Sequence, residues 1–522
     1  MSSTSRIRHQ AAPTAVRYTT SDVDDLATHG YRQHLSRSLG SFSSFAAGFS
    51  YISVLTGVFQ LFGFGFGFGG PLLFWSWLIV LAGQFTVALV FAELGARVPL
   101  AGSVYQWAKQ AGSHLVSWLA GWMMLVGSII TIAAVAIAMQ IVLPSIWMGF
   151  EVFTNTTHNA VFLGICVIAL TTTVNILGVR LMSKINNVGV AAELLGLLVV
   201  IIALLFHVHR GPGVVTHTTG VGPGLPGWHL FGYLAPLMLA AIVPGYTLFG
   251  FDTAGSLAEE TNDPRRRTPA AILRALAAAG TAGALLLIVA MMAAKSVDID
   301  TLSTGGLPLV LHDALGSAAA KIILADVAIA IFVCAMAIHT ASVRLVFSMA
   351  RDGNLPAAAR LAHVTANRKS PAVPAVIIGL LAAVILLLNT GNSKLFLVVT
   401  SVGIVTVYIA YLLVTVPLLR LRRRGWGSND ASARAGLFTM GRRTGIVVNI
   451  LAIAWGVLMG LNLIWPRADI YGAGNYAWGG VVAVAVALGA GLIFYGLRRT
   501  RVREVVAAHR HDAAASEAIL AE

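Results

Sequence analysis

The sequence predicts an all-α membrane protein with twelve transmembrane helices. The observations behind this fold class are an apolar composition, a succession of long apolar runs, and basic residues that gather at alternate ends of those runs. Of the 522 residues, 57% are hydrophobic and 11% are charged, and the mean hydropathy is +0.81. A water-soluble domain would carry about a quarter charged residues. Most of the chain is therefore expected to lie in lipid.

Twelve apolar runs have about the length of 20 residues that crosses a bilayer as a helix. They span residues 41–62, 71–97, 112–143, 160–179, 185–206, 233–257, 270–294, 320–349, 372–389, 394–419, 444–465 and 475–497. The glycine- and phenylalanine-rich stretch 63–70 is expected to connect the first two helices. Residues 1–40 and 498–522 are polar and are expected to form tails outside the membrane.

The basic residues predict the orientation of these helices. If the N-terminus is cytoplasmic, thirty of the 35 lysines and arginines lie on the cytoplasmic side, and five, Arg210, Lys295, Lys321, Lys394 and Arg467, lie outside. Such a bias is the positive-inside rule of membrane proteins. It predicts a multi-pass protein of the plasma (inner) membrane with both termini in the cytoplasm. It also explains the formal charge of +14 without nucleic acid as a partner.

Two of the runs are interrupted. The first contains Ser53-Val-Leu-Thr-Gly57, and the sixth contains Gly245-Tyr-Thr-Leu-Phe-Gly-Phe-Asp252. These breaks correspond if residues 41–206 and 233–419 form two inverted repeats of five helices, followed by two extra helices within 444–497. Glycine-broken helices at matching positions point to the binding site of a transporter, because freed backbone groups must face protein or a cavity. Close packing of helices is the alternative role for the glycines.

The sequence contains none of the common nucleotide-binding, metal-binding or hydrolase motifs. There is no GxxxxGK[ST] phosphate loop and no HExxH, CxxC or GxSxG site. Cys166 and Cys334 both lie within apolar runs, which does not support a disulfide framework. His339 and Ser342 lie three residues apart on one helix, a poor geometry for a base and a nucleophile. We therefore expect no enzyme, no cofactor and no metal centre.

Three separated motifs carry a family resemblance. They are Phe91-Ala-Glu-Leu-Gly-Ala-Arg-Val-Pro-Leu-Ala-Gly-Ser-Val-Tyr-Gln-Trp107, then Gly250-Phe-Asp-Thr-Ala-Gly-Ser-Leu-Ala-Glu-Glu260 with Asn262-Asp-Pro-Arg265, and the stretch from Arg344 to Arg351-Asp-Gly-Asn-Leu-Pro356. In this order they resemble the amino acid–polyamine–organocation superfamily. Gly30-Tyr-Arg32 and Phe49-Ser-Tyr-Ile-Ser-Val-Leu-Thr-Gly57 resemble its amino acid/choline transporter branch. The resemblance implies a leucine-transporter-type fold and substrate uptake driven by an ion gradient.

The broken helices can bind both charges of a zwitterion. N–H groups at Thr56 and Gly57 would hold the carboxylate, as helix N-termini hold anions. Carbonyl groups near Ser53 and around Phe249 and Gly250 would accept hydrogen bonds from the ammonium group. The resemblance implies that Tyr246 forms an aromatic lid and that Gly127 and Thr131 line the side-chain pocket. The alternatives are an ordinary packed aromatic for Tyr246 and an i−4 backbone hydrogen bond for Thr131.

Four acidic residues lie within the predicted spans: Glu93, Glu193, Asp252 and Asp326. An ionisable residue inside a membrane is a functional candidate by default. Glu193 aligns with a position where some relatives carry a lysine that replaces a sodium ion. Because burial favours the neutral form of a carboxylic acid, we expect Glu193 to couple uptake to the proton gradient; a purely structural hydrogen bond is the alternative.

For the other polar residues within the spans and at their ends, the sequence supports more than one role. Asp252 is a second candidate for proton coupling, although it can also cap the inner half of the sixth helix. Glu93 is expected to pair with a nearby arginine, and Glu259 and Glu260 with Arg344 or Arg351. A sodium site near His339, Thr340 and Ser342 stays open.

The sequence thus predicts a permease that imports an amino acid by proton symport, with a small molecule, protons and the bilayer as its partners. A carrier of γ-aminobutyrate, choline or a polyamine, and an exchanger that needs no ion, are the alternatives within the same family. An intramembrane enzyme or sensor is the alternative outside it.

Overall fold

The computed structural model describes residues 26–217, 221, 228–365, 368–391, 393–426, 436–468 and 474–497. These residues form helices and no strand, with one isolated parallel bridge between Leu39 and Thr261. Eleven helices in the described ranges are long and apolar enough to cross a membrane. The chain is therefore a multi-pass helical membrane protein, and the all-α prediction is confirmed.

Most of the observed helices follow the predicted runs closely. The exception is the helix Ile299–Arg351, which begins well before the predicted residue 320 and has non-helical backbone at Gly306 and Gly316. The main elements are α2 (Ser41–Ile52), α3 (Val54–Gly69), α4 (Leu72–Arg97), α5 (Ser103–Ala111), α6 (His114–Ala136), α7 (Met139–Ile146), α8 (Thr156–Leu177), α9 (Val179–Leu205), α11 (Leu234–Ala240), α12 (Ile242–Thr247), α13 (Thr253–Ser256), α14 (Pro264–Ala293), α15 (Ile299–Arg351), α17 (Ala372–Gly391), α18 (Ser393–Arg423) and α20 (Arg442–Ile464). A final span covers Gly474–Leu497.

The sixth predicted run is a series of short helices. It consists of α11, α12 and α13, and only Leu234–Thr247 qualifies as a shorter apolar helix. This interruption accounts for eleven long spans where twelve were predicted. The count of twelve crossings and the division into repeats at 41–206 and 233–419 stay predictions, as do the roles of 444–497 and of the two tails.

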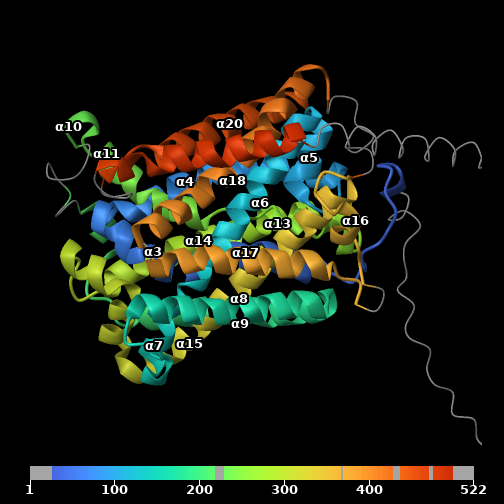
Figure 1. Ribbon diagram of the computed structural model, residues 1–522. Coiled ribbons are helices and arrows are strands. Elements are labelled where there is room, and N and C mark those ends of the chain that lie inside the picture. The colour runs from blue at the N-terminus through green and yellow to red at the C-terminus, as the bar shows by residue number, and fades with distance from the viewer. Residues whose placement is uncertain are drawn as a thin grey trace, which may run out of the picture.

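The helices pack as a bundle in which the broken segments lie inside. Helix α15 packs on α3, α9 and α6; α14 packs on α4 and α2; α18 packs on α6 and α20; and α17 packs on α8. In Figure 1 the long helices run side by side across the view, with α20 along the upper edge and α8 and α9 along the lower edge. Helices α3 and α12 contact each other, so the two interrupted segments are neighbours in space.

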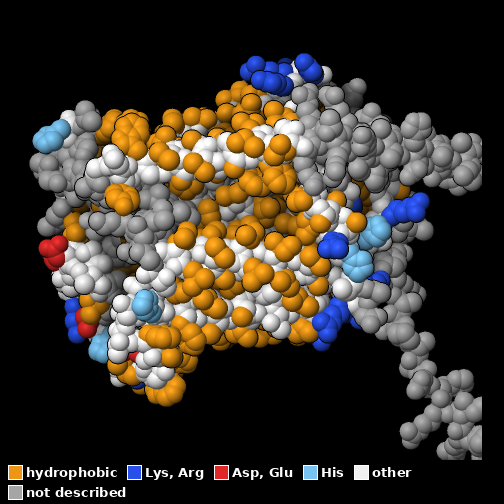
Figure 2. Space-filling view, viewed as in Figure 1, with side chains coloured by type: hydrophobic (Ala, Val, Ile, Leu, Met, Phe, Trp, Pro, Cys, Tyr) orange, Lys and Arg blue, Asp and Glu red, His pale blue; other side chains and the backbone are white. Residues whose placement is uncertain are grey.

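The outer surface of the bundle is apolar. Figure 2 shows hydrophobic side chains along its length, whereas most visible Lys and Arg side chains lie in the right-hand half, at the upper edge and at the right-hand end. We call this end of the bundle the basic end. Helices α9 and α14 begin there, with Arg180 and Arg265–Arg267, and helices α15 and α18 end there, with Arg351 and Arg423. An apolar belt bounded by basic residues matches what a bilayer requires.

The prediction for residues 63–70 is wrong, because α3 continues as a helix to Gly69. The glycines there provide close contacts with neighbouring elements. A Cβ at Gly63 would lie 2.5 Å from the Ser303 carbonyl oxygen, and one at Gly69 would lie 2.6 Å from Ala240 Cβ. Phenylalanines four residues apart stack on the helix surface, for example Phe62 and Phe66 at 5.5 Å between ring centroids. Close packing thus outweighs the low helix propensity of glycine.

Candidate functional site

The first break lies at Ser53, between α2 and α3. Its φ of 34° and ψ of 92° fall outside helical geometry. The Ser53 side chain bonds to the start of α3: its Oγ accepts from the Thr56 N–H at 3.4 Å and lies 2.7 Å from Thr56 Oγ1. The Gly57 N–H donates to the Ser53 carbonyl at 3.0 Å. The N-terminus of α3 thus opens deep in the protein, where an anion can be stabilised by the helix dipole.

The second break lies between Thr247, which ends α12, and Thr253, which begins α13. Gly250 has φ = 84°, a conformation that favours glycine. Its N–H donates to the Tyr411 hydroxyl at 3.1 Å instead of to a helical carbonyl. The predicted interruption in the sixth segment is therefore present, and a tyrosine from α18 satisfies part of its freed backbone.

The two breaks meet at Tyr51. A Cβ at Gly250 would lie 1.9 Å from the Tyr51 ring, so no other residue fits there without displacing that ring. The Phe249 ring meets the Tyr51 ring edge to face, at 5.5 Å between centroids. One turn further along α3, a Cβ at Gly57 would lie 2.5 Å from the Thr247 side chain. Both glycines thus permit contact between the broken helices.

A cavity of about 400 Å³ opens beside these breaks. Aliphatic side chains from α6, α7, α12, α15 and α18 form much of its wall: Val135, Ile141, Ile242, Val243, Ile338 and Ile404. Tyr51, Phe64, Tyr246 and Phe249 add aromatic surface. The described lining residues include no lysine, arginine, histidine, aspartate or glutamate. Small-molecule sites are typically built this way, apolar with a few placed polar groups.

The lining polar side chains mostly bond to nearby backbone. Gln60 Nε2 donates to the Ala134 carbonyl at 2.9 Å, and Thr131 Oγ1 donates to the Gly127 carbonyl at 2.7 Å. The latter is the i−4 bond given as the alternative for Thr131, although Thr131 also lines the cavity. Cys334 Sγ donates to the Tyr51 carbonyl at 3.4 Å. These bonds direct donors of Gln60, Thr131 and Cys334 to backbone carbonyls, and most of the other lining residues are apolar.

The predicted substrate residues are divided between the cavity and its support. Thr56, Gly57, Thr131, Tyr246 and Phe249 line the cavity. The remaining three, Ser53, Gly127 and Gly250, do not line it. Ser53 and Gly250 are the non-helical residues at the two breaks. A Cβ at Gly127 would lie 2.5 Å from Thr406 Oγ1, so this glycine brings α6 against α18.

Glu193 on α9 is tied directly to the first break. It is fully buried, and its Oε1 accepts from Ser53 Oγ at 2.9 Å and from the Leu55 N–H at 3.3 Å. Its Oε2 has no hydrogen-bond partner among the described residues. One carboxylate oxygen therefore stabilises the opened backbone of the first segment, and the other is available to carry a proton.

Asp252 does not cap α13 with its side chain, so the capping interpretation is wrong. The carboxylate points to other helices: Oδ1 accepts from the Tyr411 hydroxyl at 2.6 Å, and Oδ2 accepts from Ser103 Oγ at 2.9 Å. Asp252 therefore links the second break to α5 and α18. This bonding leaves its predicted role in proton coupling untested.

The polar residues of α15 near the proposed sodium position all have protein partners. His339 contacts Thr171 Oγ1 at 3.1 Å and the Ala375 carbonyl at 2.9 Å. Thr340 donates to Asn175, and Ser342 donates to the Ile338 carbonyl. No group of three or more His, Cys, Asp or Glu residues suited to a metal occurs in the described ranges.

At the basic end, acidic residues pair with arginines as expected. Glu260 accepts from Arg344 at 3.0 Å, with both side chains buried. Glu259 accepts two bonds from Arg351, at 2.9 and 3.0 Å. Glu93 bonds to Arg97 at 3.1 Å and also to Arg422. The first two pairs tie the end of α15 to the segment after α13, and the pair of Glu93 with Arg422 ties the end of α4 to the end of α18.

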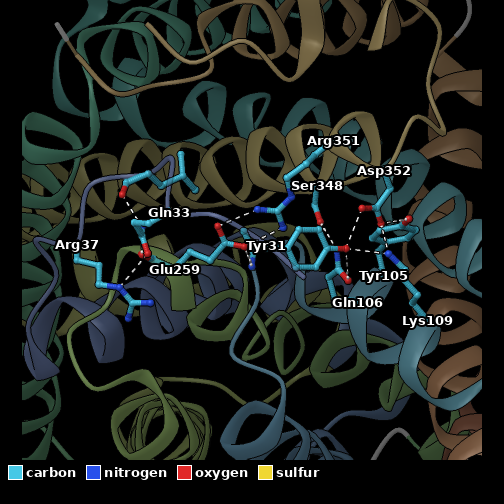
Figure 3. A network of polar contacts seen from close by, with 12 residues as sticks. Tyr31, Gln33, Arg37, Tyr105, Gln106, Lys109, Glu259, Ser348, Arg351 and Asp352 are labelled. Carbon is cyan, nitrogen blue, oxygen red and sulfur yellow. Dashed lines mark hydrogen bonds and ion pairs between the residues drawn. The ribbon is translucent and has the colours of Figure 1, made fainter. Parts of the chain in front are cut away.

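The N-terminal segment completes this closure, which sequence analysis did not predict. We call the polar contacts drawn in Figure 3 the basic-end network; its labelled members are Tyr31, Gln33, Arg37, Tyr105, Gln106, Lys109, Glu259, Ser348, Arg351 and Asp352. The Tyr31 hydroxyl donates to Asp352 at 2.8 Å, and the Arg351 guanidinium lies 4.0 Å from the Tyr31 ring centroid. Gln33 donates to the Glu259 carbonyl at 3.0 Å. Residues 31–37 thus lie across the basic end instead of forming a free tail.

Charges in this network reinforce one another. Lys109 Nζ lies 2.7 Å from Asp352 and 2.8 Å from the Tyr31 hydroxyl. Burial alone would lower the pKa of Lys109, but the Asp352 carboxylate and the Tyr31 hydroxyl together outweigh burial and raise the pKa. Burial, followed by the Asp352 charge, raises the pKa of the Tyr31 hydroxyl. Lys109 therefore stays charged and Tyr31 stays neutral at physiological pH.

Sequence reasoning missed several residues around the breaks. Tyr51, Gln60 and Cys334 line the cavity, and Tyr411 bonds to both Gly250 and Asp252. Tyr51 lies within a quoted motif, so its position next to the break was a usable signal. Tyr411 comes from a run with no local irregularity, and nothing in the sequence indicated its role.

Comparison with known proteins identifies the family of the chain. Residues 39–487 match the amino acid permease family. The chain is 28% identical to the amino-acid permease BAT1 of Arabidopsis thaliana, over 88% of this chain and 92% of the relative. It is 27% identical to a methylthioribose transporter of Bacillus subtilis (73% and 84% covered) and 25% identical to a GABA-specific permease of Saccharomyces cerevisiae (69% and 66% covered). The chain therefore belongs to the amino acid permease family of the amino acid–polyamine–organocation superfamily, whose members are transporters.

Proposed function

We propose that this permease imports a zwitterionic amino acid with an uncharged, apolar side chain across the plasma membrane, by proton symport. The observation that carries the proposal is the cavity at the two broken helices, together with the bond from Ser53 to Glu193. The cavity supplies a site for the substrate, and the bond connects that site to an acid that can carry a proton.

The substrate charges would be bound by backbone groups. The Thr56 N–H makes a long bond of 3.4 Å to Ser53 Oγ, which a substrate carboxylate can replace at the N-terminus of α3. Carbonyl groups of the unwound stretches around Ser53 and Phe249 would accept from the ammonium group. This leaves the aliphatic and aromatic wall for the substrate side chain.

The lining disfavours substrates with extra charge. A polyamine or a basic amino acid would bring a second cation into a cavity that has no carboxylate among its described lining residues. An unpaired charge away from water is costly, so such substrates should bind weakly. γ-Aminobutyrate is a zwitterion without net charge, whereas choline is a cation without a carboxylate, and both are compared directly in the experiment below.

Glu193 is proposed as the proton carrier because one of its oxygens has no partner in the described structure and it is enclosed by protein. When deprotonated, it would accept strongly from Ser53 Oγ and the Leu55 N–H and hold the first break in one geometry. When protonated, it would accept more weakly, and the start of α3 would be free to rearrange. Asp252 has both oxygens bonded and is proposed as a second, structural participant.

The orientation of the protein in the membrane is proposed from the distribution of its basic residues. The basic end is proposed to face the cytoplasm, with both termini there, because basic residues concentrate on the cytoplasmic side of membrane proteins. The basic-end network would then hold the cytoplasmic side closed while substrate and proton enter from outside.

The proposal is tested with purified protein in liposomes and a panel of labelled neutral, basic and acidic amino acids, γ-aminobutyrate, choline and putrescine. We expect accumulation of a neutral apolar amino acid when the outside is acidic, and loss of accumulation with a protonophore. Accumulation driven only by sodium, or uptake only into substrate-loaded liposomes, would contradict proton symport. Preferred uptake of putrescine would contradict the proposed substrate class.

A further inference from the structure

A second acidic residue within the bundle, Asp326 on α15, faces α9 next to Glu193. A Cβ at Gly196 of α9 would lie 1.7 Å from Asp326 Oδ2. The Asp326 carboxylate therefore lies directly against the backbone of α9, in space that only a glycine leaves open. Its Oδ2 is buried and has no hydrogen-bond partner among the described residues.

Glu193 lies on the same face of α9, three residues before Gly196. Positions three apart on a helix are neighbours, with about 5–6 Å between Cβ atoms. Glu193 Oε2 is also buried without a partner in the described ranges, and the Asp326 charge acts on Glu193. Two carboxyl groups, each with an unbonded oxygen, thus face one seam between α9 and α15.

The two acids differ in depth and in enclosure. Helix α9 begins at the basic end with Val179, so Gly196 lies about 4.5 Å further from that end than Glu193 at 1.5 Å per residue. Glu193 is fully enclosed, whereas Asp326 is half-buried. On α15, Ile322 and Ile329 lie on either side of Asp326 in sequence and are exposed on the apolar surface. Asp326 is therefore the less enclosed of the two acids, and Gly196, which it contacts, lies further from the basic end than Glu193.

Other ionisable groups near this seam are few. Helices α3, α7 and α17, which pack on α15, carry none. On α15 itself, Cys334 and His339 lie nearer the basic end and Lys321 is exposed. Four further neighbours, α2, α6, α8 and α14, carry Tyr51, His114, His158, Cys166, Arg265, Arg266, Arg267 and Arg274. Helix α5 and the short helix Ala358–Leu361 also pack on α15, and they carry Tyr105, Lys109 and Arg360. Tyr51 lies at the first break, and Arg265, Arg266 and Arg267 lie at the basic end, where α14 begins.

We propose that Asp326 is the proton donor to Glu193 and that protons enter along the seam between α9 and α15. This rests on the proposed function of Glu193. A proton from the outer solution binds the Asp326 carboxylate; its O–H bond then breaks as an O–H bond forms at Glu193, directly or through one water molecule. Asp326 becomes an anion and is protonated again from outside, so no electron transfer is required.

The proton route is separate from the substrate route. Asp326 does not line the cavity described above, whereas Thr56 and Gly57, next to the break that Glu193 bonds, do. Proton and substrate would thus meet only at the first break. An ionised side chain is costly inside a bilayer. Loss of the proton from Asp326 is therefore expected only when Glu193 is deprotonated and can accept it.

The test compares Asp326→Asn with Asp313→Asn, a matched change in the preceding helical segment of α15, before the non-helical Gly316, at a residue paired with Lys295. In liposomes we expect Asp326→Asn to slow proton-driven net uptake at least about tenfold, while substrate exchange continues, because exchange needs no net proton movement. Small weak acids such as formate or hydrazoic acid should restore part of the net rate. Asp313→Asn should behave like the wild type.

A second variant changes the position of the acid and not its chemistry. Gly196→Ala would push the Asp326 carboxylate away from α9, and we expect the same selective loss of net uptake with an unchanged melting temperature. Wild-type net uptake in Asp326→Asn, or equal loss of net uptake and exchange without rescue by weak acids, would overturn the donor role. If Glu193→Gln keeps normal proton-driven uptake, the proposed function itself fails, whatever Asp326→Asn does.

Discussion

The Ser53 hydroxyl donates to Glu193 Oε1 at 2.9 Å, joining the break in the first segment to a buried acid of α9. Ser53 has a positive φ of 34°, rare for a residue with a side chain. Its side chain bonds both Glu193 and the Thr56 N–H, and these bonds offset the strain of that backbone. A change of protonation at Glu193 would therefore act first on the residue that opens the helix.

Removing the Ser53 hydroxyl should uncouple the break from the acid. We expect Ser53→Ala and Ser53→Gly both to lose most proton-driven accumulation, because neither can donate to Glu193. Ser53→Ala should be less stable than Ser53→Gly by about 1 kcal/mol, since glycine tolerates positive φ. Uptake and thermal unfolding in detergent measure the two effects; full accumulation in Ser53→Gly would show that the hydroxyl is dispensable.

The contact between Gly250 and Tyr51 should not tolerate a side chain. Gly250→Ala places a Cβ 1.9 Å from the Tyr51 ring at φ = 84°, and we expect a loss of about 2 kcal/mol or more in stability. Substrate uptake should fall with it. Gly460→Ala on α20 is the control, because a Cβ there meets nothing within 4 Å. Equal melting temperatures for the two variants would contradict the close approach of the breaks.

The Tyr246 ring is expected to contact the substrate. Tyr246→Phe keeps the ring and should change KM by less than about threefold, whereas Tyr246→Ala should raise KM roughly tenfold, equivalent to about 1.4 kcal/mol. Initial rates of uptake over a range of substrate concentrations provide the measurement. An unchanged KM in Tyr246→Ala would mean that the tyrosine is an ordinary packed aromatic.

The basic-end network should open when its anion is neutralised. Asp352 accepts from Tyr31, Tyr105 and Lys109, so Asp352→Asn should speed amide hydrogen exchange in residues 26–39 and 103–111. Tyr31→Phe should have a smaller effect, because its ring still contacts Arg351. Asp300→Asn, at the other end of α15, is the control. If exchange in these segments does not change, the N-terminal segment is held by other contacts.

The network should also be insensitive to pH in the physiological range. Lys109 and Tyr31 both have pKa values raised in the folded protein, from ordinary values of 10.5 and 10.0. A raised pKa gives stability that is complete below the ordinary value and is lost as pH rises through the folded one. Hydrogen exchange in residues 26–39 should thus stay constant between about pH 6 and 8 and increase only above about pH 10. An increase near neutral pH would contradict these charge states.

Much of the fold follows from composition and local motifs. Apolar length located most of the spans to within several residues, although α15 begins well before its predicted start at residue 320. Gly250 marked a break because glycine readily adopts positive φ. At the first break the sequence was less informative: Gly57 looked like the interruption but lies within α3, and the non-helical residue is Ser53. A serine is held there by Glu193, 140 positions away in sequence, which local reasoning cannot detect.

Long-range partners explain the other misses. Glu259 and Arg351 were expected to pair, because both lie near the basic end. The docking of Tyr31 could not be predicted, because its partners Lys109 and Asp352 come from distant segments of the chain. Asp252 looked like a helix cap by position, but Tyr411 and Ser103 provide stronger donors in the folded bundle.

Proton flux measured together with substrate flux tests the central claim most directly. Liposomes that contain a pH-sensitive dye and receive a labelled neutral amino acid should acidify internally as the substrate enters, in a fixed ratio of protons to substrate. Glu193→Gln should exchange substrate without moving protons. Substrate accumulation without acidification in the wild type, or an unchanged proton-to-substrate ratio in Glu193→Gln, would contradict coupling through Glu193.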